Sequence, residues 1–276
     1  MNEEQIDIVE EISSIKKCEK SIITKLSILF GISTLSLLLS VVFMSIGGGK
    51  FSSKQIIGLL IMLEIVCVLL SLGFLAYHLL ADVKKEHYEK YYKYYDIIQF
   101  ILLALVIFLF LQTFIFKNAR VNGSSMDPTL HNGDIVFVMQ IHDHYKYNDV
   151  VVMDAKYYPD LDTDTFEPKP GIISSESFYV KRIKATPNQK ISYEEGTTFK
   201  FYVDDVLVAQ TDIPSYISIL KHIVDSNEGL MPKDKYLLLG DNALNSKDSR
   251  VFGLVDKKDI LGIVKLRFLK QPGLVK

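Results

Sequence analysis

Three long apolar runs in the first 116 residues constrain the fold of this 276-residue chain more than any other feature. They cover residues 26–46, 56–80 and 97–116. About 20 apolar residues make a helix long enough to cross the hydrocarbon core of a bilayer. The first run is too long, and too poor in small residues at its end, to be a removed targeting segment. We therefore expect a membrane region over residues 26–116 with three transmembrane helices, after a polar segment at residues 1–25.

Lysines are distributed unevenly around these runs. Four lie in residues 1–25 and four in residues 82–96, whereas the loop between the first two runs carries two. Loops rich in Lys and Arg stay on the cytoplasmic side of a membrane. The N-terminal segment is therefore expected in the cytoplasm, and everything after residue 116 on the extracytoplasmic side.

The second run contains one acidic residue, Glu64. A carboxylate near the bilayer centre costs about 3 kcal/mol, which the surrounding Ile, Leu, Val and Phe residues outweigh. Glu64 is either a functional carboxylate, or a residue of helix packing or assembly, or a neutral buried acid, and the interpretations other than a functional carboxylate are favoured.

From residue 117 onward the pattern changes to short runs typical of β-strands, separated by Gly, Pro, Asn and Asp. Expected strands cover residues 135–138, 150–153, 179–183, 199–203, 206–208, 236–239 and 260–268, with one helix at 216–224. The region 117–276 is thus predicted to be one mainly β domain. Both cysteines, Cys18 and Cys67, precede it, so it contains neither a disulfide nor a thiolate site. The formal net charge of −2 favours no nucleic-acid partner.

Two short polar stretches carry residue types that can bind metal ions. Asp160, Asp162 and Asp164 have the spacing that opens a calcium loop, but Thr165 and Gly171 stand where that loop needs Gly and Glu. The stretch 142–144, His-Asp-His, has no partner cluster. Both are interpreted as surface segments, and no metal is expected.

A pair of serines stands on a sharp turn soon after the third run. Residues 122–130 read NGSSMDPTL, in which Gly123 permits unusual backbone angles and Pro128 fixes its own φ. A serine held on such a turn can direct its hydroxyl at a ligand, so Ser125 is a candidate nucleophile. The usual general base is a histidine backed by a carboxylate, but no downstream histidine has a recognisable catalytic context.

A lysine can replace that histidine where burial favours its neutral form. The ordinary lysine pKa of about 10.4 must then fall by about 3 units. Residues 179–183 read YVKRI, and strand alternation places Lys181 on the face of Tyr179 and Ile183, with Arg182 on the other face. Lys181 is therefore the candidate base.

A third segment, residues 240–250, reads GDNALNSKDSR. With the serine turn and the Lys181 strand, it resembles the motifs of bacterial type I signal peptidases, Ser-Met-x-Pro-Thr-Leu and Gly-Asp-Asn-x-x-x-Ser-x-Asp-Ser-Arg, in the order of that family. The resemblance covers residues 123 to about 268. It implies a signal-peptidase-like β fold for the catalytic domain.

The resemblance also implies a role for each site residue. Ser125 is the nucleophile and Lys181 the base, Ser246 hydrogen-bonds and orients Lys181, and Asp248 and Arg250 form a supporting ion pair. The remaining implied residues support or shape the site: Asp241, Gly123, Met126 and Pro128.

Two departures from the family pattern affect the site. Gly123 stands where some members have a serine that binds the oxyanion, so the Ser125 backbone N–H is the main expected donor, with Ser124 as a second candidate. The family's Gly-Leu-Pro-Gly-Asp is here Ala185-Thr186-Pro187-Asn188-Gln189, which leaves the conformation of this loop open.

By resemblance, the chain is a membrane-bound serine endopeptidase that removes signal peptides from exported precursors with small residues before the cleavage site. Its partners are those precursors and the lipid bilayer, it needs no cofactor, and it lies in the bacterial cell membrane with its catalytic domain outside. Two alternatives stay open: an inactive membrane-anchored binding or scaffold protein, and a self-cleaving Ser-Lys protease of the repressor type.

Overall fold

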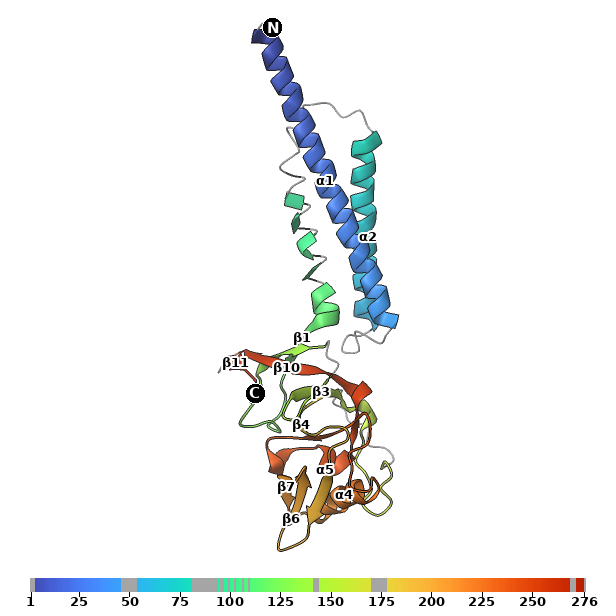
Figure 1. The fold of residues 1–276 in the computed structure, drawn as a ribbon, viewed down its shortest axis with the longest axis vertical. Helices are drawn as coiled ribbons and strands as arrows, with labels where there is room; N and C mark the ends of the chain where they lie inside the picture. Colours follow the sequence, from blue (N-terminus) through green and yellow to red (C-terminus); the bar gives the residue numbers. More distant parts are fainter. Residues whose placement is uncertain are drawn as a thin grey trace. The chain divides into compact units, whose positions relative to one another are not determined.

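The computed structural model describes residues 3–45, 54–80, 94, 97–98, 100–101, 103–105, 107–108, 110–140, 144–169, 178–268 and 272–275. The chain forms two compact units, Met1–Ile115 and Phe116–Lys276 (Figure 1). Most of the two segments on which the lysine count depends, residues 47–55 and 82–96, lie outside the described residues.

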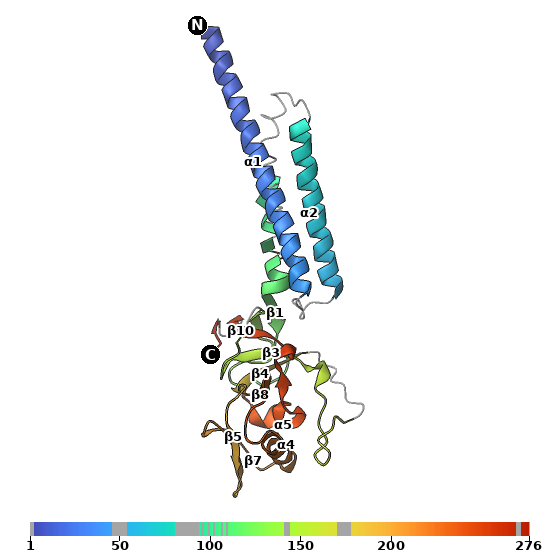
Figure 2. The ribbon, with the colours of Figure 1, turned by 45° about the vertical axis from the view of Figure 1, so that its right-hand side comes forward.

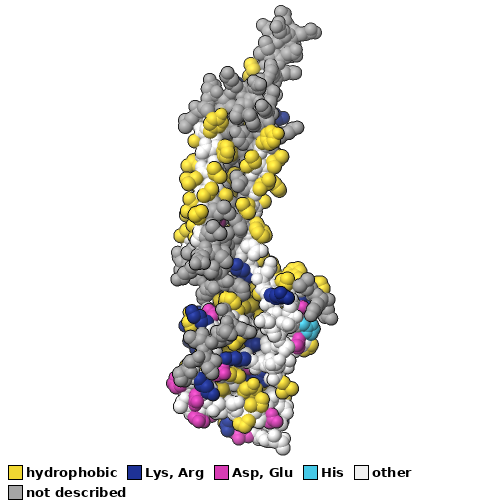
Figure 3. All heavy atoms as spheres, turned by 180° about the vertical axis from the view of Figure 1, so that it is seen from behind, with side chains coloured by type: hydrophobic (Ala, Val, Ile, Leu, Met, Phe, Trp, Pro, Cys, Tyr) yellow, Lys and Arg dark blue, Asp and Glu magenta, His cyan; other side chains and the backbone are white. Residues whose placement is uncertain are grey.

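In the first unit, helices α1 (Glu3–Ser45) and α2 (Lys54–Leu80) pack side by side (Figure 2). The described residues between 94 and 110 are helical as well. Helix α1 begins well before residue 26, so the segment expected to be separate continues the first apolar helix. Apolar side chains gather on the surface of this unit (Figure 3). Within the described residues, only Ile12–Val42 is long and apolar enough to cross a membrane, and Glu64–Tyr77 is a shorter apolar helix.

Glu64 lies at the contact between these two helices and is only 3% exposed. Ser36 and Ser40 of α1 donate hydrogen bonds to its Oε1 at 2.8 and 3.2 Å. Hydrogen bonds between helices that share an apolar environment stabilise their association. This arrangement supports the interpretation of Glu64 as a helix-packing residue.

The end of the third apolar run differs from the expectation. A π-helix covers Leu111–Ile115, and strand β1 (Phe116–Arg120) follows at once. The Phe116 ring packs against Phe137 at 4.7 Å between ring centroids. The last residue of the predicted span therefore belongs to the β unit, because its aromatic ring contributes to the packing of the sheet.

The second unit is built on an antiparallel sheet with the strand order β1-β2-β10-β3-β4-β8-β9, and β11 pairs with β10. Its other strands are β2 (Ile135–Met139), β3 (Val150–Asp154), β4 (Phe178–Ala185), β8 (Lys235–Leu239), β9 (Val255–Asp256), β10 (Ile260–Phe268) and β11 (Gly273–Leu274). Both faces of β8 are buried: Leu237 and Leu239 lie in one hydrophobic cluster and Leu238 in the other. The sheet thus carries two hydrophobic cores, which explains the near-continuous apolar run of β8.

A second sheet of three strands has the order β5 (Ile191–Glu194), β6 (Phe199–Val203) and β7 (Val206–Thr211). Helix α4 (Pro214–Asp225) packs on the same core, with Ile219, Leu220 and Ile223 buried beside Phe201. The remaining short elements are the 3₁₀ turns η2 (Ala155–Tyr157), η3 (Ala243–Asn245) and η4 (Lys257–Asp259) and the helix α5 (Ser249–Phe252).

The prediction of a mainly β domain is confirmed, and each of the seven expected strands and the one expected helix has a counterpart. Sequence reasoning missed β1, β5 and the two-residue strands β9 and β11. Strand β1, Phe-Lys-Asn-Ala-Arg, lacks the apolar alternation that marks a half-buried strand, and β5 is only four residues long.

Candidate active site

Ser125 lies on a compact turn between β1 and β2. Two side chains of this turn, Met126 and Leu130, are 1% and 0% exposed and anchor it to the core. Its backbone is closed by hydrogen bonds from Asp127 N–H to Ser124 O at 3.1 Å and from Leu130 N–H to Met126 O at 2.9 Å. Gly123 has a φ of 94°, and the Asp127–Pro128 peptide bond is cis. The turn therefore holds Ser125 on a well-connected backbone.

The Lys181 side chain reaches Ser125 from strand β4. Its Nζ lies 2.9 Å from Ser125 Oγ, and the residue is only 3% exposed. The same Nζ lies 5.3 Å from the centre of the Tyr179 ring, on the face that strand alternation predicts. Sequence reasoning placed this serine and this lysine in one site from motifs alone, and the fold brings the two side chains into hydrogen-bond distance.

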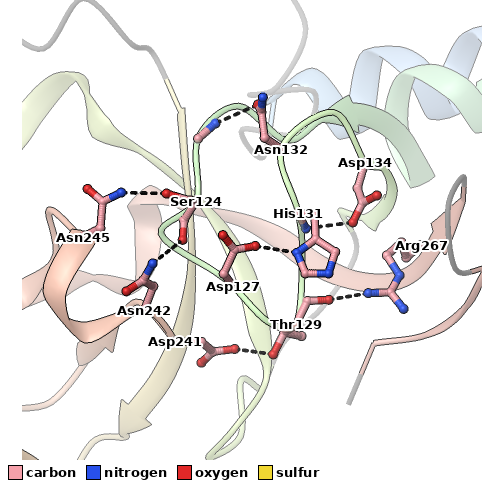
Figure 4. A network of polar contacts seen from close by, with 11 residues as sticks. Ser124, Asp127, Thr129, His131, Asn132, Asp134, Asp241, Asn242, Asn245 and Arg267 are labelled. Atoms are coloured by element: carbon pink, nitrogen blue, oxygen red, sulfur yellow. Dashed lines mark hydrogen bonds and ion pairs between the residues drawn. The ribbon is translucent and has the colours of Figure 1, made fainter.

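The segment between β8 and α5 lies beside the serine turn, and its Asp241, Asn242 and Asn245 side chains point toward that turn (Figure 4). Asn242 donates from its backbone N–H to Ser125 O at 3.0 Å and from its Nδ2 to Ser124 O at 3.1 Å. Asn245 Nδ2 donates to Ser124 Oγ at 2.6 Å. Neither asparagine was assigned a role from sequence, although both belong to the Gly-Asp-Asn segment that identified this region.

Gly240, at the start of this segment, has no space for a side chain. A Cβ there would lie 2.1 Å from Ser246 Oγ and 2.6 Å from Ser125 O. The glycine is therefore required because the backbone passes directly against the serine turn.

Ser246 differs from its expected role. Within the described part of the chain its Oγ is buried and has no hydrogen-bond partner, so the expected hydrogen bond to Lys181 is not formed. The hydroxyl instead lies against Gly240, as the contact distances of that glycine show. Ser246 is thus a neighbour of the Ser125 backbone in this structure.

Asp248 and Arg250 form the ion pair that the resemblance implies. Arg250 Nη2 lies 2.6 Å and its Nε 2.8 Å from the two carboxylate oxygens, and both side chains are almost completely buried. Asp248 Oδ2 also accepts the Gly240 N–H at 2.9 Å. The pair therefore connects α5 to the backbone that packs against the serine turn.

Arg182 is the main site residue that sequence reasoning missed. Its Nε and Nη2 bind the two oxygens of Asp241 at 2.8 and 2.7 Å. Thr129 Oγ1 donates to Asp241 Oδ2 at 2.6 Å. The signal was available: alternation places Arg182 opposite Lys181, and a buried arginine needs an anionic partner.

This contact ties the serine turn to the strand that carries Lys181, and it affects the charge of Asp241. Burial alone would raise the pKa of Asp241, but the hydrogen bonds from Arg182 and Thr129 bring that pKa below the ordinary value of an aspartate. Asp241 therefore remains an anion and keeps its partner arginine in place.

A histidine and a carboxylate also meet on the serine turn. His131 Nδ1 lies 2.5 Å from Asp127 Oδ1, and His131 N–H donates to Asp134 Oδ2 at 2.8 Å (Figure 4). Lys181, not His131, is the residue whose side chain bonds to Ser125 Oγ. The Asp127–His131 pair is partly exposed, unlike the buried Met126 and Leu130 of the same turn.

The loop at 185–189, which departs from the family pattern, is closed by a hydrogen bond between its own residues. Asn188 has a φ of 66°, a left-handed conformation that Asn tolerates better than most residues with a side chain. Gln189 Oε1 accepts the Thr186 N–H at 2.7 Å. Asn188 and Gln189 therefore close this loop in a conformation of their own.

The acidic stretch at 160–164 forms a hydrogen-bonded loop. Asp162 Oδ1 accepts the N–H groups of Asp164 and Thr165 at 2.9 and 3.1 Å, and Asp160 pairs with Lys247 at 2.5 Å. No cluster of metal-ligating side chains occurs among the residues that the structure describes. Of the stretch 142–144, only His144 is described.

A family model and several relatives that match this chain are signal peptidases. Residues 94–269 match the family described as signal peptidase, peptidase S26. Signal peptidase I P of Bacillus subtilis subsp. natto is 32% identical over 180 residues, which cover 63% of this chain and 88% of that protein. Signal peptidase IB of Staphylococcus aureus strain Mu50 is 33% identical over 183 residues, 61% of this chain and 85% of that protein.

The relatives also include a protein named as inactive. Inactive signal peptidase IA of Staphylococcus aureus strain Mu50 is 29% identical over 170 residues, which cover 61% of this chain and 87% of that protein. Overall similarity alone therefore does not distinguish an active member from an inactive one, and the individual site residues must decide.

Proposed function

The chain belongs to the signal peptidase family, peptidase S26, and from this premise we propose that it is an active Ser-Lys endopeptidase. The observation that carries the proposal is the 2.9 Å contact between Lys181 Nζ and Ser125 Oγ in a buried setting. A nucleophile and a base within hydrogen-bond distance form the basic unit of covalent catalysis. No metal or cofactor takes part in the proposed reaction.

Lys181 acts as the general base. Removing an ammonium group from water disfavours its charged form, so burial favours the neutral amine that can accept a proton. As Ser125 Oγ attacks the scissile carbonyl carbon, its proton passes to Lys181 Nζ. The same proton then leaves with the amine of the departing chain, and the serine remains acylated.

The Ser125 backbone N–H stabilises the negative oxygen of the tetrahedral intermediate. Among the described residues this N–H makes no hydrogen bond, which leaves it available to an oxyanion. Ser124 stays the second candidate donor, because its Oγ accepts a hydrogen bond from Asn245 Nδ2 at 2.6 Å and keeps its own hydroxyl hydrogen to donate. Water, deprotonated by Lys181, finally hydrolyses the acyl-enzyme. Ser246, Asp248, Arg250 and Asp241 support this site without touching the reacting atoms.

The alternative of an inactive scaffold is raised by the relatives named as inactive. Against it stand Ser125 and Lys181, both present and in contact. The alternative of a self-cleaving repressor-type protease is disfavoured by the long apolar helix at Ile12–Val42.

The substrates are exported precursor proteins with small residues before the cleavage site, and the enzyme acts at a membrane. We propose the multi-pass arrangement with spans near residues 26–46, 56–80 and 97–116 and the unit from residue 116 outside the cytoplasm. Protease added to intact cells should then cut within residues 160–169 and leave residues 82–96 intact. The reverse pattern would contradict this orientation.

Cleavage of a purified precursor by the full-length protein in detergent tests the chemistry. Ser125→Ala and Lys181→Ala should both abolish cleavage. Lys181→Arg should do the same, because arginine keeps the charge but does not deprotonate in a protein. Lys184→Ala is the matched control, since Lys184 lies on the same strand and bonds to Asn148. Substantial cleavage by Lys181→Arg would place the general base elsewhere, and cleavage by Ser125→Ala would reject Ser125 as the nucleophile.

A further inference from the structure

The peptide bond between Ser124 and Ser125 is held unusually firmly, and this bears on the proposed oxyanion donor. Its carbonyl oxygen, Ser124 O, accepts two hydrogen bonds, one from Asp127 N–H and one from Asn242 Nδ2, both at 3.1 Å. Because a peptide group is planar and trans, its N–H points away from its C=O. Holding Ser124 O therefore also sets the direction of the Ser125 N–H.

Asn242 holds the backbone on both sides of that N–H. Its side chain binds the carbonyl that precedes Ser125 N, and its own N–H binds the Ser125 carbonyl at 3.0 Å. Both contacts use carbonyl oxygens and leave the Ser125 N–H unoccupied among the described residues. One residue, 118 positions away from Ser124, thus restrains both peptide groups that meet at Ser125.

Asn242 is itself fixed in place. The neighbouring residue Asp241 is bound by Arg182 and Thr129. The backbone carbonyl of Asn242 accepts the Asn245 N–H at 3.1 Å. An orienting side chain must be supported in this way to hold a donor within the narrow tolerance of a catalytic site.

We propose that Asn242 is a positioning residue that aims the Ser125 N–H at the developing oxyanion. The inference rests on the proposed function, because that function is what assigns the Ser125 N–H to the oxyanion of the tetrahedral intermediate. Dependence on one well-aimed donor is strong in this chain because Gly123 supplies no hydroxyl, and a preorganised donor is worth more than a mobile one.

The test is Asn242→Ala in the full-length protein, which removes the Nδ2 donor and keeps the backbone N–H that binds Ser125 O. We expect kcat to fall about 10–100-fold, less than the 10²–10³-fold cost of removing an oxyanion donor, because Asp127 N–H still binds Ser124 O. KM should stay within about twofold, since an oxyanion donor acts on the transition state. A peptide aldehyde, which forms a tetrahedral adduct with a catalytic serine, should bind more weakly by the same factor as kcat falls.

Asn227→Ala is the matched control. Asn227 Nδ2 also donates to a backbone carbonyl, that of Ile223 at 2.7 Å, but Asn227 follows the end of α4 and belongs neither to the serine turn nor to the 240–250 segment. It should leave kcat and aldehyde binding unchanged, whatever its effect on thermal stability. If Asn242→Ala does not fold, Asn242→Asp, which keeps the shape of the side chain, is measured in the same way.

An unchanged kcat in Asn242→Ala would overturn the proposal. So would a fall in kcat without a matching loss of aldehyde affinity, because that would separate Asn242 from the oxyanion. These outcomes are distinct from a failure of the proposed function, which would appear as activity in Ser125→Ala or Lys181→Arg.

Discussion

Gly240→Ala is the smallest change that should disable this site, since it adds one methyl group. The added Cβ would lie 2.1 Å from Ser246 Oγ and 2.6 Å from Ser125 O, well inside the 3.4 Å at which ordinary contact begins. The Ser246 hydroxyl can rotate away, but the Ser246 Cβ, also 2.6 Å from the added atom, cannot, and the Ser125 carbonyl belongs to the backbone that carries the proposed nucleophile. Relieving the clash therefore requires the serine turn and the Gly240 segment to separate.

The expected cost follows from these contacts. Overpacking a well-filled region costs about 1–3 kcal/mol. For a unit of this size each kcal/mol lowers the melting temperature by about 2–4 °C, so a decrease of about 2–12 °C is expected. Catalysis should suffer more, because a displacement of about 1 Å in a reacting group can cost about 10²-fold in rate.

Precursor cleavage and thermal unfolding of the full-length protein in detergent measure the two effects. Gly196→Ala is the matched control, because its Cβ would meet only Thr198 O at 3.8 Å. A Gly240→Ala protein with wild-type kcat/KM would refute the reasoning, since it would mean that the serine turn does not depend on this close approach.

Two further predictions concern charge and backbone conformation. The pKa of Asp241 is lowered in the folded state, so its carboxylate contributes stability above the ordinary aspartate value of about 4 and loses that contribution as the pH falls through the folded-state pKa. Denaturant unfolding between about pH 3 and pH 6 should show a weaker pH dependence in Asp241→Asn than in the wild type, and equal slopes would contradict this role. Gly123→Ser would place a hydroxyl where the resemblance implies a serine in some family members. The space is open, but a φ of 94° strains any residue with a Cβ. We expect a stability loss of about 1–2 kcal/mol and no gain in kcat, and faster turnover in this variant would show that the second donor outweighs the strain.

Much of the chemistry was accessible from the sequence alone. Ser125, Lys181 and the Asp248–Arg250 pair could be named as candidates because the serine turn and the 240–250 segment are specific strings, and the short Lys181 strand gains its meaning only together with them. The β character of the second unit followed from apolar runs of strand length. Successive side chains of a strand point to opposite faces, so these runs indicate which residues are buried. Both kinds of pattern involve residues that are close together in the chain, so they can be recognised from the sequence alone.

The contacts that hold the site together came only from the tertiary structure. Arg182 binds Asp241 and Asn242 binds Ser124 O across 59 and 118 positions of sequence. The absence of a Ser246–Lys181 hydrogen bond and the lack of space at Gly240 depend on how β8 and the serine turn approach each other. Side-chain partners that lie far apart in the chain are selected by packing, and the residue pattern of either segment alone does not encode the distance between them.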